Sequence, residues 1–252
     1  MYRYYDTYGT YHSGKIYSDN KHYFKFDLEQ DDVFELLKKI RPSVVVSALR
    51  GPFSAQVEAH QTLVEYAEQS KCRIVFLSSA NVFDAFAHYP SYEHDKTLSE
   101  SIYGKLKIRC ETLLMRHLPE KQYAIVRLPM VFGVGSPRMK EIKNAILLNE
   151  AIEVFPHLII NTTTDTKCCQ QLHYIINRNR YGIFHLGSKD LVHHKEFVGD
   201  LIQVMDLDHK PLYKNVFTSN FDRYLAVLPR DNSLPKHLSI TNEEVIMGSQ
   251  QM

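Results

Sequence analysis

Three residues in the middle of the chain have side chains and spacing suited to polarising a carbonyl group. Ser79 ends an apolar run that begins at Arg73, and Tyr103 and Lys107 open a helical pattern. Because residues four apart share one face of a helix, the phenol and the ammonium should lie side by side. An ammonium favours the phenolate and lowers a tyrosine pKa from its usual ~10, so the phenol could exchange a proton near neutral pH. The pattern predicts a proton donor, its activator and a second hydrogen-bond donor to one substrate oxygen.

A Tyr-x-x-x-Lys pair by itself is weak evidence for a site. A chain with 16 tyrosines and 30 lysines and arginines contains such spacings by chance. The strand-like run before Ser79, and the 24 positions that separate Ser79 from Tyr103, make the pattern more specific. The residues therefore indicate an ancestral active site, and whether that site still turns over is a separate question.

The same stretch resembles the extended short-chain dehydrogenase/reductase superfamily, and within it the dTDP-4-dehydrorhamnose reductase branch. That branch carries Ser-Thr-Asp-Tyr-Val-Phe and, a similar distance later, Tyr-Gly-x-x-Lys, whereas residues 78–83 here read Ser-Ser-Ala-Asn-Val-Phe. Ser79 takes the place of the family's catalytic threonine, while Ala80 and Asn81 replace its Asp and Tyr. The resemblance implies that Ser79, Tyr103 and Lys107 are catalytic, that the cofactor is NADP or NAD, and that the partner is a nucleotide-linked sugar. The missing aspartate leaves the sugar open.

The resemblance also implies cofactor-binding positions elsewhere in the chain. Asp27 resembles the family's Asp near the adenine, although acids before a helix also serve as caps. Residues 47–49 end an apolar strand where the family reads Asn-Ala-Ala, although small residues at strand ends are common without a ligand. Met130 lies where the family lines the nicotinamide side. The expected cofactor-binding set is Asp27, Ser47, Ala48, Leu49, Tyr103, Lys107 and Met130, and no metal ligands are expected.

Strand-like and helical segments alternate along the chain, which predicts an α/β fold. We expect a doubly wound, parallel Rossmann-like sheet with a small interleaved C-terminal substrate lobe. Residues 1–133 would form the nucleotide-binding domain, and residues 134–252 a mixed α/β lobe interleaved with the last sheet strands. The first buried strand, at 44–49, should be covered on both faces because it is continuously apolar and β-branched. Further strands are expected at 73–77 and at 123–128, the latter continuing to 133, with helices at 33–40, 54–69 and 103–117.

The sequence contains no G-x-x-G-x-x-G motif, which the family carries between its first strand and first helix. Gly9 and Gly14 are the only glycines before Gly51. Such a turn lets backbone N–H groups and a helix N-terminus approach a pyrophosphate, so its loss would weaken or abolish cofactor binding. Either the chain is a fragment from which the first strand and helix are missing, or it has abandoned nucleotide binding. The buried character of the later strands favours the fragment.

Composition excludes several other classes of protein. A net charge of +1 gives no electrostatic case for binding nucleic acid or a membrane surface. No apolar run reaches the ~18 residues of a membrane helix, and Met1 to Asp6 lack the apolar segment of a signal peptide. Four cysteines without C-x-x-C spacing indicate free thiols in a reducing compartment, so a cytoplasmic location is expected. The oligomeric state stays open, a homodimer included.

Three functional hypotheses follow from these patterns. The first is an NAD(P)-dependent reductase or epimerase that acts on a nucleotide-linked sugar. The second is a non-catalytic sugar-nucleotide-binding or regulatory subunit, which the missing Gly-rich turn, Ala80 and Asn81 favour. The third is a truncated, inactive product that aggregates through an unpaired central strand edge.

Overall fold

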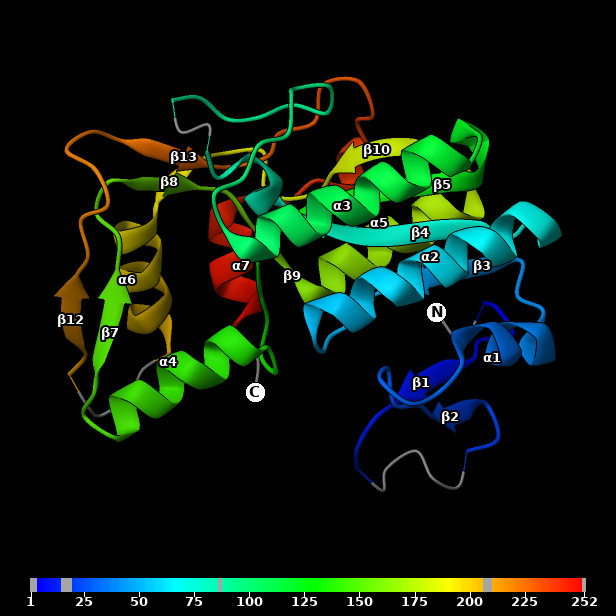
Figure 1. The fold of residues 1–252 in the computed structure, drawn as a ribbon. Helices are drawn as coiled ribbons and strands as arrows, with labels where there is room; N and C mark the ends of the chain where they lie inside the picture. Colours follow the sequence, from blue (N-terminus) through cyan, green and yellow to red (C-terminus); the bar gives the residue numbers. More distant parts are fainter. Residues whose placement is uncertain (1–3, 15–19, 86–87, 206–209, 251–252) are drawn as a thin grey trace. The chain divides into compact units, whose positions relative to one another are not determined.

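The structure is a computed structural model that describes residues 4–14, 20–85, 88–205 and 210–250 (Figure 1). It has the mixed α/β architecture with parallel strands that the sequence predicts. The chain forms two compact units. The first comprises Met1–Leu77, Arg109–Ile125 and Ile175–Gly182, and the second comprises Ser78–Ile108, Val126–Tyr174 and Ile183–Met252. A domain boundary at residue 133 stays a prediction.

A β-α-β element forms the centre of the first unit. Strand β3 (Val44–Ser47) runs parallel to β4 (Arg73–Ser79), and helix α2 (Phe53–Ser70) makes the crossover between them. A helical crossover is the usual way to join parallel neighbours, because a tight turn can only join antiparallel ones. The buried face of α2 is formed mainly by small and branched apolar residues, which are Ala55, Val57, Ala59, Leu63, Val64 and Ala67.

Strand β3 is the edge of its sheet, and the expectation that it is covered on both faces is wrong, because one of its side chains is exposed. The four-stranded sheet has the order β10-β5-β4-β3, and Val46 of β3 is 39% exposed. In the same unit, β1 (Gly9–Tyr11) and β2 (Tyr23–Lys25) form a separate parallel pair. The β-branched sequence of β3 suits a fully covered strand. The exposure of Val46 shows that the face to which this side chain points is only partly covered, and no strand in the described ranges pairs with the outer edge of β3.

Helix α1 (Val33–Ile40) begins and ends where the sequence predicts. The Asp32 carboxylate accepts a hydrogen bond from the Phe34 amide at 2.7 Å and so caps the first turn. The helix stops at Arg41, which adopts a left-handed φ of 53°, and Pro42 then prevents its continuation. Phe34 packs edge-on against Tyr66 of α2, with 6.0 Å between ring centroids.

In the second unit, the strand that the sequence predicts over residues 123–133 is two strands. β5 (Tyr123–Leu128) belongs to the four-stranded sheet with β10 (Gly182–His185). Pro129 then interrupts the ladder because proline has no backbone N–H to donate. After it, β6 (Met130–Phe132) pairs in parallel with β9 (Thr162–Thr164) instead. The expectation of one continuous strand is therefore wrong. Two strands lie on either side of Pro129, and they belong to different sheets.

The remaining elements of the second unit surround three small sheets and an apolar cluster that includes Phe132, Met139, Phe197, Leu201 and Val245. Strand β8 (Leu158–Ile160) lies between β11 (Val192–His193) and β13 (Arg223–Leu225), and β7 (Ala151–Val154) pairs with β12 (Leu212–Asn215). The helices are α3 (Ile102–His117), α4 (Pro137–Leu147), α5 (Asp165–Asn177), α6 (His194–Val204) and α7 (Asn242–Gly248). Short 3-10 turns form η1 (Ala80–Phe83) and η3 (Lys236–Leu238) in this unit and η2 (Glu120–Gln122) in the first unit. None of the helices in the described ranges combines the length and apolar character that a membrane crossing needs.

Candidate active site

Ser79 occupies the junction between β4 and the turn η1. Its backbone is extended, and its hydroxyl oxygen accepts the Asn81 amide hydrogen at 3.2 Å, which caps η1. The same hydroxyl donates its proton to Oδ1 of Asn81 at 2.9 Å. The hydroxyl is therefore held in one orientation. To donate to a substrate oxygen, Ser79 must exchange its bond to Asn81 for a bond to the substrate.

Tyr103 and Lys107 lie on one face of the first two turns of α3, as their spacing predicts. The Lys107 ammonium is 5.5 Å from the centroid of the Tyr103 ring. Tyr103 is 42% exposed, whereas Lys107 is only 6% exposed. The predicted pairing of the phenol with the ammonium is therefore present in the structure, and a catalytic role for the two residues stays a prediction.

Gly104 allows the first turn of α3 to pack against η1. A Cβ at this position would overlap the Asn81 carbonyl oxygen and the Ser99 hydroxyl. Only glycine permits such a close approach of two backbones. Tyr103 precedes this contact by one residue, and Ser79 precedes η1 by one residue. The contact therefore sets the separation between the helix that carries the phenol and the turn that carries the serine.

Asp84 fixes the start of α3 from the other end of η1. Its carboxylate accepts hydrogen bonds from the hydroxyls of Ser99 at 2.9 Å and Ser101 at 2.5 Å, and from the amide of Glu100 at 2.7 Å. The Ser101 oxygen in turn accepts the Gly104 amide hydrogen at 3.0 Å. These bonds satisfy donors at the helix N-terminus that have no partner within the helix. The carboxylate therefore holds the segment from which Tyr103 emerges.

The predicted cofactor residues 47–49 end strand β3 in the first unit. Ser47 is 3% exposed, and its hydroxyl lies 2.9 Å from Nε2 of His60. Nδ1 of His60 lies 2.6 Å from the Gln56 carbonyl oxygen, so Nδ1 donates and Nε2 accepts the Ser47 proton. Ala48 is exposed and Leu49 is half-buried. Ser47 thus has a buried structural partner, and a cofactor contact by these residues stays a prediction.

Asp27 and Met130 also take part in local structure. The Asp27 carboxylate accepts the Glu29 amide hydrogen at 3.0 Å, and the Asp27 amide donates to the Asp31 carboxylate at 2.7 Å. These bonds shape the turn before α1. Met130 begins β6 and packs against the apolar cluster that contains Phe132. Contact of either residue with a cofactor stays a prediction.

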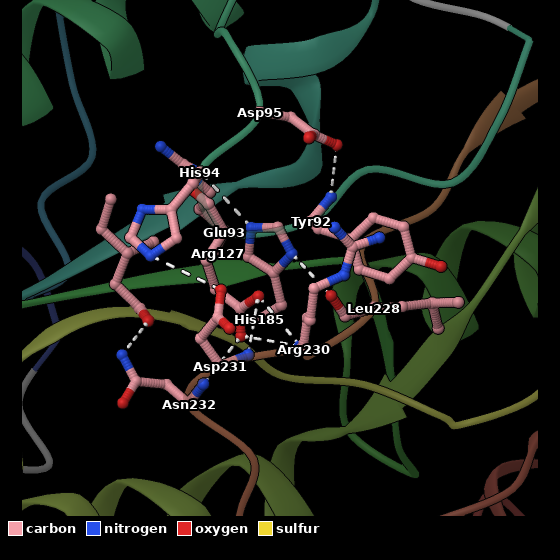
Figure 2. Close-up of polar contacts among 11 residues, drawn as sticks. Tyr92, Glu93, His94, Asp95, Arg127, His185, Leu228, Arg230, Asp231 and Asn232 are labelled. Carbon is pink, nitrogen blue, oxygen red and sulfur yellow. Dashed lines mark hydrogen bonds and ion pairs between the residues drawn. The ribbon is translucent and has the colours of Figure 1, made fainter.

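A buried polar network lies among the strands and loops of the second unit (Figure 2). The Arg127 guanidinium donates from Nη1 to the Glu93 carbonyl oxygen at 2.9 Å and to Nε2 of His185 at 3.3 Å. Nδ1 of His185 lies 3.2 Å from the Ser91 carbonyl oxygen and 3.1 Å from that of Leu228, so Nδ1 carries the hydrogen. Burial, and then the charge of Arg127, lower the pKa of His185 to about 3. The imidazole is therefore neutral at physiological pH.

Phe83 connects this network to the turn that follows Ser79. The Arg127 guanidinium carbon is 4.8 Å from the centroid of the Phe83 ring, a cation–π contact. The His185 ring meets the same phenyl ring edge-on, with 5.8 Å between centroids. Phe83 is the last residue of η1 and is 2% exposed. The turn next to Ser79 therefore packs, through Phe83, against the buried network of Arg127 and His185.

Sequence reasoning missed three residues that this geometry shows to be important. Gly104 and Asp84 have local signals: a glycine directly after the tyrosine, and serines at 99 and 101 just before the helix. Glu93 has no local signal, because its carboxylate binds main-chain groups 137 to 139 residues later. Contacts of that separation leave no mark on the periodicity of the sequence.

The two ends of a nicotinamide cofactor fit this chain differently. Near Tyr103, an accessible phenol with a buried ammonium suits the nicotinamide and its ribose. For the pyrophosphate, the sequence supplies no Gly-rich turn after a strand. Within the described part of the chain, no group of three His, Cys, Asp or Glu side chains could hold a metal ion.

Solved structures with the same fold include dTDP-4-dehydrorhamnose reductases. That of Clostridium acetobutylicum is 19% identical with a TM-score of 0.73, and the match covers 96% of this chain and 97% of that one. That of Bacillus anthracis, in complex with NADP, is 17% identical with a TM-score of 0.74 and 96% coverage of both chains. A UDP-glucuronic acid 4-epimerase from Bacillus cereus, in complex with NAD, is 16% identical with a TM-score of 0.68, covering 91% of this chain and 78% of that one.

At such low identities these likenesses establish the fold, which is that of Rossmann-like reductases. No curated protein sequence matches the chain. The model of one protein family, described as the RmlD substrate binding domain, matches residues 50–232. That range includes Ser79, Tyr103, Lys107 and the network of Figure 2. The chain therefore belongs to the RmlD substrate binding domain family.

Proposed function

We propose that this protein is an NAD(P)-dependent reductase or epimerase of the short-chain dehydrogenase/reductase type that acts on a nucleotide-linked sugar. The observation that carries the proposal is the pairing of an accessible Tyr103 phenol with a buried Lys107 ammonium, on a helix that packs against the turn after Ser79. Family membership and the reductase fold support the same reading. NADP or NAD is the proposed cofactor.

In the proposed reaction, Tyr103 and Ser79 act on the oxygen of a sugar ketone, and Lys107 acts on Tyr103. The cofactor supplies hydride to the carbonyl carbon. Tyr103 gives its phenolic proton to the oxygen, so that the ketone becomes an alcohol. Lys107 stabilises the phenolate that remains and would hold the ribose of the cofactor. Ser79 orients the carbonyl through its hydroxyl, which turns from Asn81 to the substrate.

One observation favours a second candidate, a sugar-nucleotide-binding subunit without turnover. The Ser79 hydroxyl already donates its proton to Asn81, so no hydrogen of Ser79 is directed at a substrate. Such a protein would keep the sugar-nucleotide surface of the family and bind NAD(P) weakly or not at all. The reductase or epimerase would need the phenol of Tyr103 as its proton donor, whereas the binding subunit would not.

The direct test is oxidation of NADPH or NADH, followed by nicotinamide absorbance, with dTDP- and UDP-linked keto sugars as substrates. A reductase transfers deuterium from the labelled cofactor to the sugar carbon, which mass spectrometry detects in the product. Tyr103→Phe should abolish this transfer. Binding of a sugar nucleotide with no transfer of deuterium, and no cofactor binding at millimolar concentration, would establish the second candidate instead.

A further inference from the structure

The Glu93 carboxylate is bound by three consecutive main-chain N–H groups. Glu93 is 1% exposed, and its two oxygens accept hydrogen bonds from the amides of Arg230 at 2.9 and 3.1 Å, Asp231 at 3.4 Å and Asn232 at 3.2 Å (Figure 2). Bonds from amides to an ionised carboxylate are stronger than those between neutral groups. A buried charge without such partners would be strongly disfavoured. The carboxylate therefore fastens two chain segments that are far apart in the sequence.

The residues around Glu93 strengthen this connection. Ser91 and Val227 form a parallel bridge, in which the Ser91 amide donates to Ala226 at 2.9 Å and the Leu228 amide donates to Ser91 at 3.0 Å. Nearby, the Arg230 guanidinium lies 3.8 Å from the centroid of the Tyr92 ring. In addition, Nε2 of His94 lies 3.5 Å from an Asp231 carboxylate oxygen, and both of these side chains are exposed. The segment around residue 92 therefore has several contacts with residues 226–232, and Glu93 supplies the buried carboxylate among them.

Segment 91–101 leads directly from Glu93 into the helix that carries Tyr103. The Leu98 amide donates to the Val82 carbonyl oxygen at 2.9 Å, which places the segment beside η1. Three residues later, Ser101 accepts the Gly104 amide hydrogen in the first turn of α3. Glu93 thus holds one end of a short, bonded segment whose other end sets the first turn of the helix.

We propose that Glu93 is a positioning residue for Tyr103. By binding the main-chain N–H groups of residues 230–232, its carboxylate fixes segment 91–101, and through that segment the first turn of α3. The inference rests on the proposed function in so far as it concerns turnover. The effect on α3 itself can be measured without any activity.

The experiment compares wild type, Glu93→Ala and Glu93→Gln by amide hydrogen exchange, steady-state kinetics and cofactor binding. Glu93→Gln keeps the shape and one acceptor oxygen but removes the charge, so it should lie between the other two. Gln171→Leu is the matched control. Gln171 is 3% exposed and donates one buried hydrogen bond to the Leu238 carbonyl oxygen at 2.9 Å, outside segment 91–101. The Gln171→Leu variant should be less stable than wild type, but hydrogen exchange in the first turn of α3 should be unchanged.

In Glu93→Ala, amides 230–232 should exchange at least about tenfold faster, because each loses a hydrogen bond. Peptides that cover residues 99–107 should also lose protection. Turnover should fall by about 100-fold, since a small displacement of a catalytic group can have that effect. The cofactor Kd should rise less than turnover falls, because Lys107, the proposed ribose contact, lies beyond the first turn of α3 that Glu93 positions. Gln171→Leu should change neither peptide region.

Two results would overturn the proposal. One is faster exchange at 230–232 with unchanged protection at 99–107, since the carboxylate would then fasten only the C-terminal segment. The other is equal loss of protection at 99–107 in Gln171→Leu, which would indicate general destabilisation. If Glu93→Ala does not fold, Glu93→Gln decides by the same criteria. If wild type reduces none of the sugars tested, the proposed function fails, while exchange at 99–107 still decides the role of Glu93.

Discussion

Two serines end neighbouring strands, and the structure places them in different surroundings. Ser47 ends β3 in the first unit, is 3% exposed and shares its proton with His60. Ser79 ends β4, is half-buried and shares its proton with Asn81, directly before a turn that packs against the first turn of α3. Both hydroxyls have partners. The two serine hydroxyls therefore differ in burial and in the residue that accepts their proton, and only the less buried one is proposed to bind a substrate.

The comparison shows why residue type at a strand end is an incomplete guide to function. An imidazole on a helix of the same unit holds Ser47 by a bond that water cannot reach. The partner of Ser79 is two residues away in its own turn, so a substrate oxygen can replace it by a small rotation of the hydroxyl. The proposed site therefore depends on accessible elements around Ser79, and each prediction below tests part of that difference.

The largest effect is expected from Tyr103→Phe. Removing the phenolic oxygen removes the proposed proton donor, and turnover should fall by about 100- to 10,000-fold. The thermal midpoint should change little, because Tyr103 is 42% exposed, and a raised cofactor Kd would support the predicted cofactor contact of Tyr103. Tyr89→Phe is the control, since Tyr89 is 79% exposed and belongs to the same unit. Steady-state kinetics measures both variants, and equal activities would remove Ser79, Tyr103 and Lys107 as a catalytic group.

Gly104→Ala should destabilise the protein and displace Tyr103. The new methyl group would overlap the Asn81 carbonyl oxygen and the Ser99 hydroxyl, and backbone cannot yield as a flexible side chain can. Overpacking of this kind typically costs about 1–3 kcal/mol. Gly135→Ala is the control, because a Cβ there meets nothing within 4 Å. Denaturant unfolding of the two variants should differ by that amount, and a difference near zero would refute the close packing of α3 on η1.

Ser79→Ala and Ser47→Ala test the comparison directly. Ser79→Ala should lower turnover by roughly tenfold, the effect of losing one hydrogen bond to the substrate, and should lower the free energy of unfolding by about 1 kcal/mol through loss of the η1 cap. Ser47→Ala should leave a buried imidazole nitrogen without its donor and lower the free energy of unfolding by about 1–2 kcal/mol. A raised cofactor Kd in Ser47→Ala would instead support the predicted cofactor contact. Kinetics, unfolding and cofactor titration on both variants separate these outcomes.

A smaller effect should appear in the pH dependence of stability. The pKa of His185 is lowered to about 3 by burial and by Arg127, and that of His194 to about 4 by burial and by Arg138. Both imidazoles are neutral in the folded protein, whereas the unfolded chain takes up protons near pH ~6.5. Stability is therefore complete above that pH and decreases as the pH falls toward the folded values.

Between pH ~7.5 and ~5.5, each of these histidines should lower the free energy of unfolding by about 1.4 kcal/mol. His185→Gln, which can donate and accept as the neutral imidazole does, should remove roughly half of their joint contribution. Urea unfolding of wild type and variant at the two pH values measures this change in the free energy of unfolding. An unchanged slope in the variant would mean that His185 takes up its proton at the same pH in the folded protein as in the unfolded chain, contrary to the network in Figure 2.

Some features of this protein were determined by short stretches of sequence. The Asp32 cap, the stop before Pro42 and the i, i+4 placement of Tyr103 and Lys107 involve neighbours within one or two helical turns. The order of helices and strands follows from periodicity in the same way. These features could be predicted because the interactions that produce them act between residues close in the chain.

The tertiary structure alone decided how these elements meet. It left β3 at the edge of its sheet and divided the predicted strand at Pro129. It placed the Ser47 hydroxyl within hydrogen-bond distance of His60. It also brought the Glu93 carboxylate to amides 137 residues later. The physical reason is that burial and long-range hydrogen bonds depend on which surfaces pack together, and residue spacing contains no information about that packing.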